Sequence, residues 1–170
     1  FVRGLEILCG HQTLISIENP SLSNILLDMQ FDTIYHEHYS YLSATAVTNI
    51  CRLNNLHLSR VEDLTIHGGS KRYWLKKASV DDFTDPSVTK TINFEMENGL
   101  FNEERWASYS SKVFSILSDL KNWLDEGKSD GKRIYGYGAA AKASTILNFS
   151  GIDPNLIIAI ADVSLEKQQR

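Results

Sequence analysis

Hydrophobic residues recur near the amino end first at helical and then at strand spacing. Val2, Leu5 and Leu8 fall on one face of a predicted helix that Gly10 closes. The β-branched run at 13–17 predicts a strand, and the sequence Asn-Pro-Ser at 19–21 is expected to break it. A helix followed by a strand is typical of an α/β fold.

The middle of the chain also predicts a helix followed by strands. Ser43 is expected to cap a helix over 44–54, and the runs 56–61 and 71–77 predict two strands that pair as an antiparallel hairpin. From 78 to 99 the composition becomes polar, and we expect a domain boundary there. The predicted domains are therefore 1–77 and 78–170.

A long helix and a βαβ unit follow. Asn102 is the expected cap of a helix whose apolar residues keep helical spacing until Gly127. After a polar turn come a strand from 132, a glycine turn, a helix to about 149 and a second strand at 156–161. A right-handed crossover would place the two strands parallel, with the glycine turn at their carboxyl edge.

Composition and charge exclude some classes of protein. The chain has 170 residues, a net charge of −4 and 42% hydrophobic residues, with no apolar run long enough to cross a bilayer. We therefore expect neither a membrane nor a nucleic-acid partner. Cys9 and Cys51 are far apart and predict buried thiols in a reducing cytoplasm. The chain lacks an initiating Met and a signal peptide, so we expect a piece of a longer protein.

The glycine turn is the first candidate site. Gly136, Gly138 and Ala139 fit the pattern GxGxxA between a strand and a helix, where backbone N–H groups and the helix dipole favour a phosphate. Lys142 could add a positive charge. The same small residues also suit close packing of strand and helix, so both interpretations stay open.

The second candidate is the crowded segment 31–41. Here Tyr35, His36, Glu37 and His38 offer a base, a carboxylate that orients an imidazole, and a hydroxyl for an oxyanion. Such a set suits proton abstraction beside a carbonyl. A metal site is not expected, because too few further ligands are close in sequence. A purely structural aromatic loop is the remaining alternative.

The third candidate is the turn His67, Gly68, Gly69 and Ser70. Paired glycines often form a hairpin turn and nothing more. They also allow a ligand to approach backbone N–H groups, with His67 and Ser70 as polar neighbours.

Four separated motifs together resemble the sugar C-methyltransferases, which use S-adenosylmethionine on nucleotide-linked keto-sugars. They are the segments 16–22, 31–41, 67–70 and 136–142, in the family's order, followed by the short match 166–168. The resemblance implies that 1–77 is the carboxy-terminal half of a class I methyltransferase sheet and 78–170 is a truncated Rossmann-like domain. It also implies that the loop for S-adenosylmethionine lies outside this chain.

The resemblance implies roles for individual residues. His38 would be the base, Tyr35 would stabilise the enolate or position the sugar, and Glu37 would orient the imidazole. Residues 67–70 would lie near the substrate, although this chain has Lys71 where the family commonly has Leu. By the same resemblance, the turn residues Gly136, Gly138 and Ala139, together with Lys142, are expected to face the nucleotide-sugar diphosphate.

Two other functions remain possible from the sequence. One is a module that binds a nucleotide or nucleotide sugar without catalysis. The other is an NAD-dependent oxidoreductase in which Asp162 holds the adenosine ribose. The identity of the sugar, the nucleotide and the methylated carbon stays open, as does the oligomeric state. We expect this piece to be inactive alone.

Overall fold

The computed structural model describes residues 1–168 and has mixed α/β structure, as the sequence predicted. It divides into two compact units. The first contains Phe1–Gln30 and Tyr39–Trp106, and the second contains Phe31–His38 and the chain from Ala107 onward. The assignment of 1–77 and 78–170 to two domains stays a prediction.

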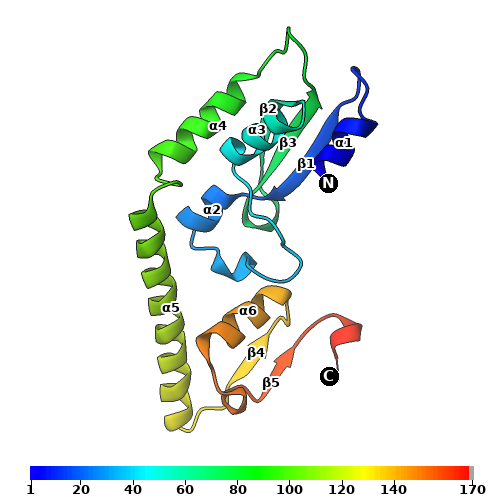
Figure 1. Ribbon diagram of the computed structural model, residues 1–170. Coiled ribbons are helices and arrows are strands. Elements are labelled where there is room, and N and C mark those ends of the chain that lie inside the picture. The colour runs from blue at the N-terminus through cyan, green and yellow to red at the C-terminus, as the bar shows by residue number, and fades with distance from the viewer. Residues whose placement is uncertain (169–170) are drawn as a thin grey trace. The chain divides into compact units, whose positions relative to one another are not determined.

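The first unit is built on a three-stranded sheet. Its strands are β1 (Ile15–Pro20), β2 (Leu56–Leu64) and β3 (Ser70–Lys77), in the order β1-β3-β2, with β3 antiparallel to both neighbours (Figure 1). The antiparallel hairpin is thus confirmed. The predicted break at 19–21 is confirmed, because β1 ends at Pro20 and Ser21 caps the helix that follows. A proline is tolerated there because β1 is an edge strand.

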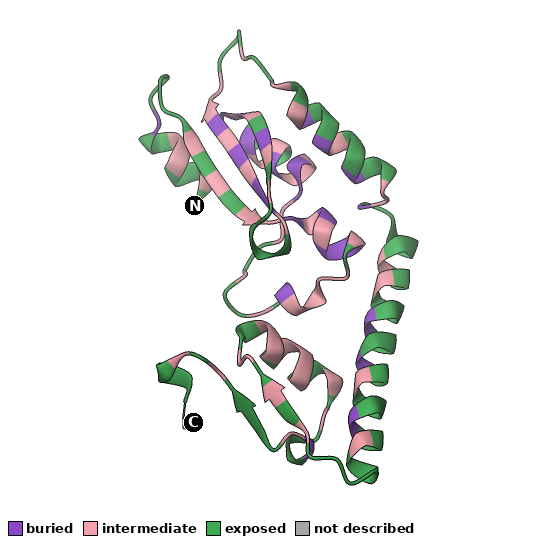
Figure 2. Cartoon of the chain, turned by 180° about the vertical axis from the view of Figure 1, so that it is seen from behind, coloured by how far each residue is buried: buried purple, intermediate pink, exposed green. Residues whose placement is uncertain are grey.

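The first unit also contains helices, two of which pack on strand β2. They are α1 (Val2–Leu8), α2 (Leu22–Leu27), α3 (Ala44–Leu53) and α4 (Pro86–Glu97), and both α3 and α4 pack on β2. Ser43 caps α3 as predicted, since its Oγ accepts from Ala46 N at 3.0 Å. Buried and half-buried residues alternate along β3 from Lys71 to Lys76 (Figure 2). The buried residues of the core are Ala44, Val47, Cys51, Leu56, Leu58, Val61, Tyr73, Leu75 and Val88.

Helix α4 occupies the polar stretch in which the sequence predicted only a boundary. Asp85 caps it by accepting from Ser87 N at 2.8 Å, and Pro86 is its first residue. Its buried side chains include Thr91 and Glu95. Two of the residues that face the core are therefore polar, which hides the apolar stripe by which a helix is recognised.

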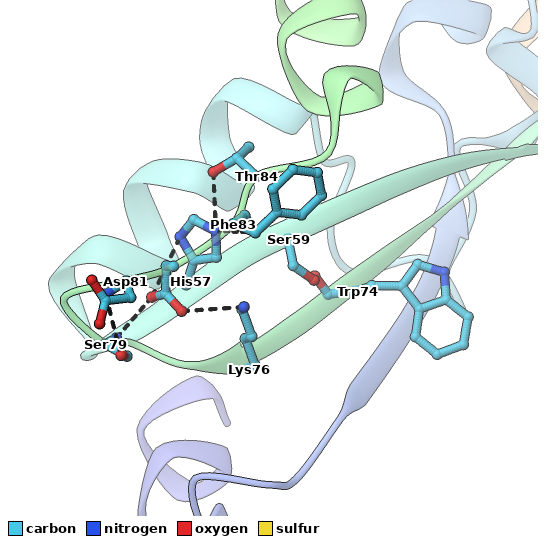
Figure 3. Close-up of polar contacts among 9 residues, drawn as sticks. His57, Ser59, Trp74, Lys76, Ser79, Asp81, Phe83 and Thr84 are labelled. Carbon is cyan, nitrogen blue, oxygen red and sulfur yellow. Dashed lines mark hydrogen bonds and ion pairs between the residues drawn. The ribbon is translucent and has the colours of Figure 1, made fainter.

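The connection 78–85 is fastened to the strands before α4 begins (Figure 3). Thr84 Oγ1 lies 3.1 Å from His57 Nε2, and Lys76 Nζ lies 3.2 Å from Asp82 Oδ1. Asp82 also accepts from Ser79 N at 2.7 Å. Desolvation alone would raise the pKa of Asp82, but this backbone hydrogen bond and the charges of Lys76 and His57 lower it overall. The connection therefore sets the start of α4.

The second unit contains most of the long helix and the βαβ unit. Helix α5 (Glu103–Ser129) begins as predicted, with Asn102 Oδ1 accepting from Glu104 N at 2.8 Å. Strands β4 (Tyr135–Tyr137) and β5 (Ala159–Ala161) pair parallel and are connected by α6 (Ala141–Ser150). This confirms the predicted βαβ unit. No helix within residues 1–168 combines the length and hydropathy that a bilayer crossing requires.

Candidate functional site

The imidazole of His38 is held by the backbone of its own loop. A short 3-10 helix, η1 (Phe31–Thr33), places Thr33 O at 2.9 Å from His38 Nδ1. Because a carbonyl oxygen can only accept a hydrogen bond, Nδ1 carries the proton of the neutral ring. His38 Nε2 therefore keeps the lone pair that a general base needs.

Tyr35 lies directly against His38 Nε2. Its hydroxyl is 3.4 Å from His38 Nε2, and the two ring centroids are 4.4 Å apart. A phenol and an unprotonated nitrogen thus meet at one point of a half-buried loop. This pair can take a proton from a carbon and donate a hydrogen bond to an adjacent oxygen, which are the two needs of enolisation.

Tyr35 and His36 line a cavity of about 420 Å³ in the second unit. Most of the other lining residues belong to α6, including the polar side chains Ser144 and Asn148. The two residues are four positions apart and so lie on one face of the helix. The structure thereby brings the segment 31–38 together with the helix that follows the glycine turn.

The carboxylate of Glu37 is exposed and lies 4.0 Å from His36 Nε2. That Thr33 O fixes the imidazole of His38 was not predictable from the sequence, because a backbone carbonyl is present at every residue type. An orienting role for Glu37 stays a prediction. Ser144 and Asn148 were also missed, since they fall outside the motif that drew attention to this region.

Glycine is needed at the two positions of the turn for different physical reasons. A Cβ on Gly136 would lie 3.0 Å from Ile160 Cγ1, so this glycine allows β4 and β5 to pack closely. Gly138 has a φ of +89°, and a Cβ there would meet nothing within 4 Å. Close packing therefore explains Gly136, whereas Gly138 combines a left-handed backbone with open space beside it.

Part of the predicted phosphate cradle is occupied by the protein itself. Ala139 N donates to Asp162 Oδ2 at 2.7 Å, and Gly138 N donates to Ala161 O at 2.7 Å. Asp162 is the carboxylate that an NAD site would need for the ribose. Lys142 Nζ lies 3.8 Å from Asp32 Oδ2. The N–H groups left for an anion are those of the first turn of α6, whose cap residue Ala140 makes no side-chain cap.

We predict that the turn loosens in acid because of Asp162. Hydrogen bonds from Ser164 N and Ala139 N lower the pKa of this carboxyl below its usual 3.8. A lowered folded-state pKa contributes stability that is present above the unfolded value and is lost as pH falls through the folded value. An NMR titration should show the Ala139 amide resonance unchanged from pH 7 to 5 and shifting only below about 3.8. In Asp162→Asn the acid-induced shift should be absent.

The turn 67–70 lies in the first unit and packs against the segment after β1. Gln30 Nε2 donates to Gly68 O at 2.6 Å, and Ser70 is buried. A Cβ on Gly69 would lie 2.6 Å from Asn24 Nδ2, and Gly69 has a φ of +116°. Both glycines are therefore required by the fold, which supports the structural interpretation without deciding whether His67 and Ser70 also bind substrate.

Gly69→Ala is expected to destabilise the first unit by about 3 kcal/mol, from backbone strain together with displacement of Asn24. Gly99→Ala is the matched control, because Gly99 has a φ of +71° but its nearest contacts would be an ordinary 3.6 Å. It should cost about 1 kcal/mol. Urea unfolding of both variants gives the comparison, and equal losses would show that Asn24 yields without cost.

Among residues 1–168 there is no group of three or more His, Cys, Asp or Glu side chains placed to hold a metal ion. The burial of Cys51 raises its thiol pKa to about 11, which keeps the thiol protonated and unreactive at neutral pH.

Comparisons with known proteins agree with the resemblance of the motifs. Residues 65–170 match the family described as the C-methyltransferase C-terminal domain. Over 167 residues the chain is 28% identical to C-methyltransferase NovU of Streptomyces niveus, and the match covers 98% of this chain and 40% of that protein. The chain thus spans less than half the length of this relative. Since the family match covers more than half of the chain, this protein belongs to the family of C-methyltransferase C-terminal domains.

Proposed function

We propose that the complete protein transfers a methyl group from S-adenosylmethionine to a carbon next to the ketone of a nucleotide-linked sugar. The observation that carries this proposal is the pair formed by His38 and Tyr35. His38 Nδ1 is bound to Thr33 O, and Nε2 lies 3.4 Å from the Tyr35 hydroxyl. The family membership and the similarity to a C-methyltransferase support the same conclusion.

The residues of this chain would carry out the proton transfer. His38 Nε2 takes the proton from the carbon beside the ketone, and the electron pair of that C–H bond moves to the ketone oxygen. Tyr35 donates a hydrogen bond to the resulting enolate oxygen. The enolate carbon is then the nucleophile that accepts the methyl group.

The methyl donor would be held mainly by residues outside this chain. The glycine turn at 136–139 is unsuitable as the loop that binds S-adenosylmethionine, because two of its N–H groups already donate to Ala161 O and Asp162. S-adenosylmethionine, when bound, supplies the methyl group as an electrophile. The first turn of α6, whose N–H groups are left for an anion, is better suited to the diphosphate of the sugar substrate.

The arrangement of the first sheet supports the proposed class I methyltransferase fold. The sheet of a class I methyltransferase ends in two parallel strands separated by an antiparallel strand. In this chain the order β1-β3-β2 with an antiparallel β3 fits this description. Residues 107 onward would then belong to the Rossmann-like domain. Cys9 and Cys51 are free thiols, which supports the proposed cytoplasmic location.

Methyl transfer can be tested with the complete protein and a panel of nucleotide-linked 4-keto-sugars. The donor should carry a deuterated methyl group, so that mass spectrometry identifies its transfer to carbon. Transfer that requires both the nucleotide and the ketone would support the proposal. Tight binding of the nucleotide sugar without any transfer would instead favour a binding module.

A further inference from the structure

A second polar cavity lies in the first unit, apart from the cavity beside Tyr35. It has a volume of about 340 Å³ and is lined by Asn24, Asp63, Lys71, Lys90, Thr91 and Phe94. Lys71 is near the start of β3, which runs antiparallel to β1 and β2, so it lies where those two strands end. This is the carboxyl edge, at which α/β sheets bind their ligands.

Lys71 is buried to an extent that is unusual for a lysine. Its side chain is only 7% exposed, although Lys is almost never fully buried without a partner. Its partner is the carboxylate of Asp63, whose side chain is 82% exposed. An exposed carboxylate interacts weakly because water screens its charge, and an ammonium has three donors to satisfy. The cation is therefore incompletely compensated.

A second lysine lines the same cavity as Lys71. Among the described residues, Lys90 has no hydrogen bond or ion pair, and it is exposed on the wall of the same cavity. Asn19 lies opposite Lys71 in the sheet register, and both polar atoms of its buried side-chain amide lack a partner. Lys90 would gain an ion pair from an anion in this cavity, whose lining does not include Asn19.

The nearby acid Glu95 does not cancel this positive charge. Its two oxygens accept from Ala44 N at 2.6 Å, Thr45 N at 3.0 Å and Thr45 Oγ1 at 2.7 Å. They are thus directed at the amino end of α3, where a carboxylate is favoured by the helix dipole. Two ammonium groups and one exposed carboxylate remain at the cavity.

We propose that this cavity binds a phosphoryl group, with Lys71 and Lys90 as its cationic contacts. Asp63 holds Lys71 in place until the anion arrives and then turns toward water. The site is distinct from the catalytic pair and does not depend on the proposed function. Its phosphoryl group can come from free phosphate or from a nucleoside diphosphate.

The test is isothermal titration calorimetry of the complete protein at fixed ionic strength. Inorganic phosphate, inorganic pyrophosphate and a nucleoside diphosphate serve as separate probes. The heat that Lys90→Met loses is assigned to this cavity. Loss with all three probes indicates a site for free phosphate, whereas loss with the nucleoside diphosphate alone indicates a nucleotide site. An absence of heat with every probe overturns the proposal.

Variants that remove single lysine charges then test whether Lys71 and Lys90 contact the anion. Lys71→Met and Lys90→Met should each weaken binding by about tenfold or more, because each removes a charge-assisted contact. Lys121→Met, which removes an exposed lysine from α5, should change Kd by less than about twofold. If Lys71→Met does not fold, the exposed Lys90 still provides the test. Unchanged binding in Lys90→Met would contradict the proposal.

Asp63→Asn gives a result of opposite sign. It removes the carboxylate that competes with the anion for Lys71, so phosphate should bind several-fold more tightly. A purely structural ion pair would instead lose stability without any gain in phosphate affinity. Binding that is unchanged or weaker in Asp63→Asn would overturn the site.

Discussion

Replacing His38 with Gln in the complete protein is expected to slow methyl transfer by about 10²–10⁴-fold. Glutamine keeps a polar side chain of similar reach, but its amide nitrogen cannot take a proton from carbon. The bond from His38 Nδ1 to Thr33 O at 2.9 Å shows why only Nε2 is available as the base. The rate is measured by mass spectrometry of the methylated product, at saturating substrate.

His36→Gln is the matched control for this variant. The two histidines are two positions apart, but the His36 side chain is 83% exposed and its ring lies beside Glu37 rather than Thr33. We expect its rate to stay within a few-fold of the wild-type rate. A large loss in His36→Gln together with a small loss in His38→Gln would exchange the roles of the two residues and refute our assignment.

Replacing Glu95 with Ala is expected to lower the free energy of unfolding by about 3 kcal/mol. Glu95 is fully buried, and its carboxylate accepts three hydrogen bonds at the start of α3. The variant leaves Ala44 N and Thr45 N without their acceptor inside the protein. Unfolding in urea, followed by circular dichroism, measures the loss.

Glu97→Ala is the control on the same helix, because Glu97 is exposed. It should change stability by less than about 0.5 kcal/mol. The comparison separates loss of the buried hydrogen bonds from loss of a glutamate in α4. Equal effects of the two variants would show that Glu95 does not tie α4 to α3.

Elements with a regular apolar stripe were predictable from the sequence. Helix α5 and the βαβ unit have apolar residues or glycines at the required spacing, and Ser43 and Asn102 mark helix starts by residue type. Helix α4 was not predictable in this way, because Thr91 and Glu95 face the core where apolar residues are expected. Its start was nevertheless encoded in Asp85 and the proline that follows.

The candidate site was predictable in its residue types but not in its geometry. The density of Tyr and His at 35–38 indicated proton transfer, whereas the choice between the two ring nitrogens depends on a carbonyl that no side-chain pattern reveals. The glycine turn was predictable in its sequence pattern but not in its hydrogen bonds. The pattern GxGxxA does not say that Asp162 already accepts from Ala139 N, because that contact forms only when the second strand returns beside the first.

The central claim is that His38 removes a proton from the carbon beside the ketone. The most direct measurement incubates the complete protein with a nucleotide-linked keto-sugar in deuterated water without the methyl donor, and follows deuterium at that carbon by mass spectrometry. We predict rapid exchange with the wild-type protein and with His36→Gln, and almost none with His38→Gln. Equal exchange in His38→Gln and the wild type would contradict the claim.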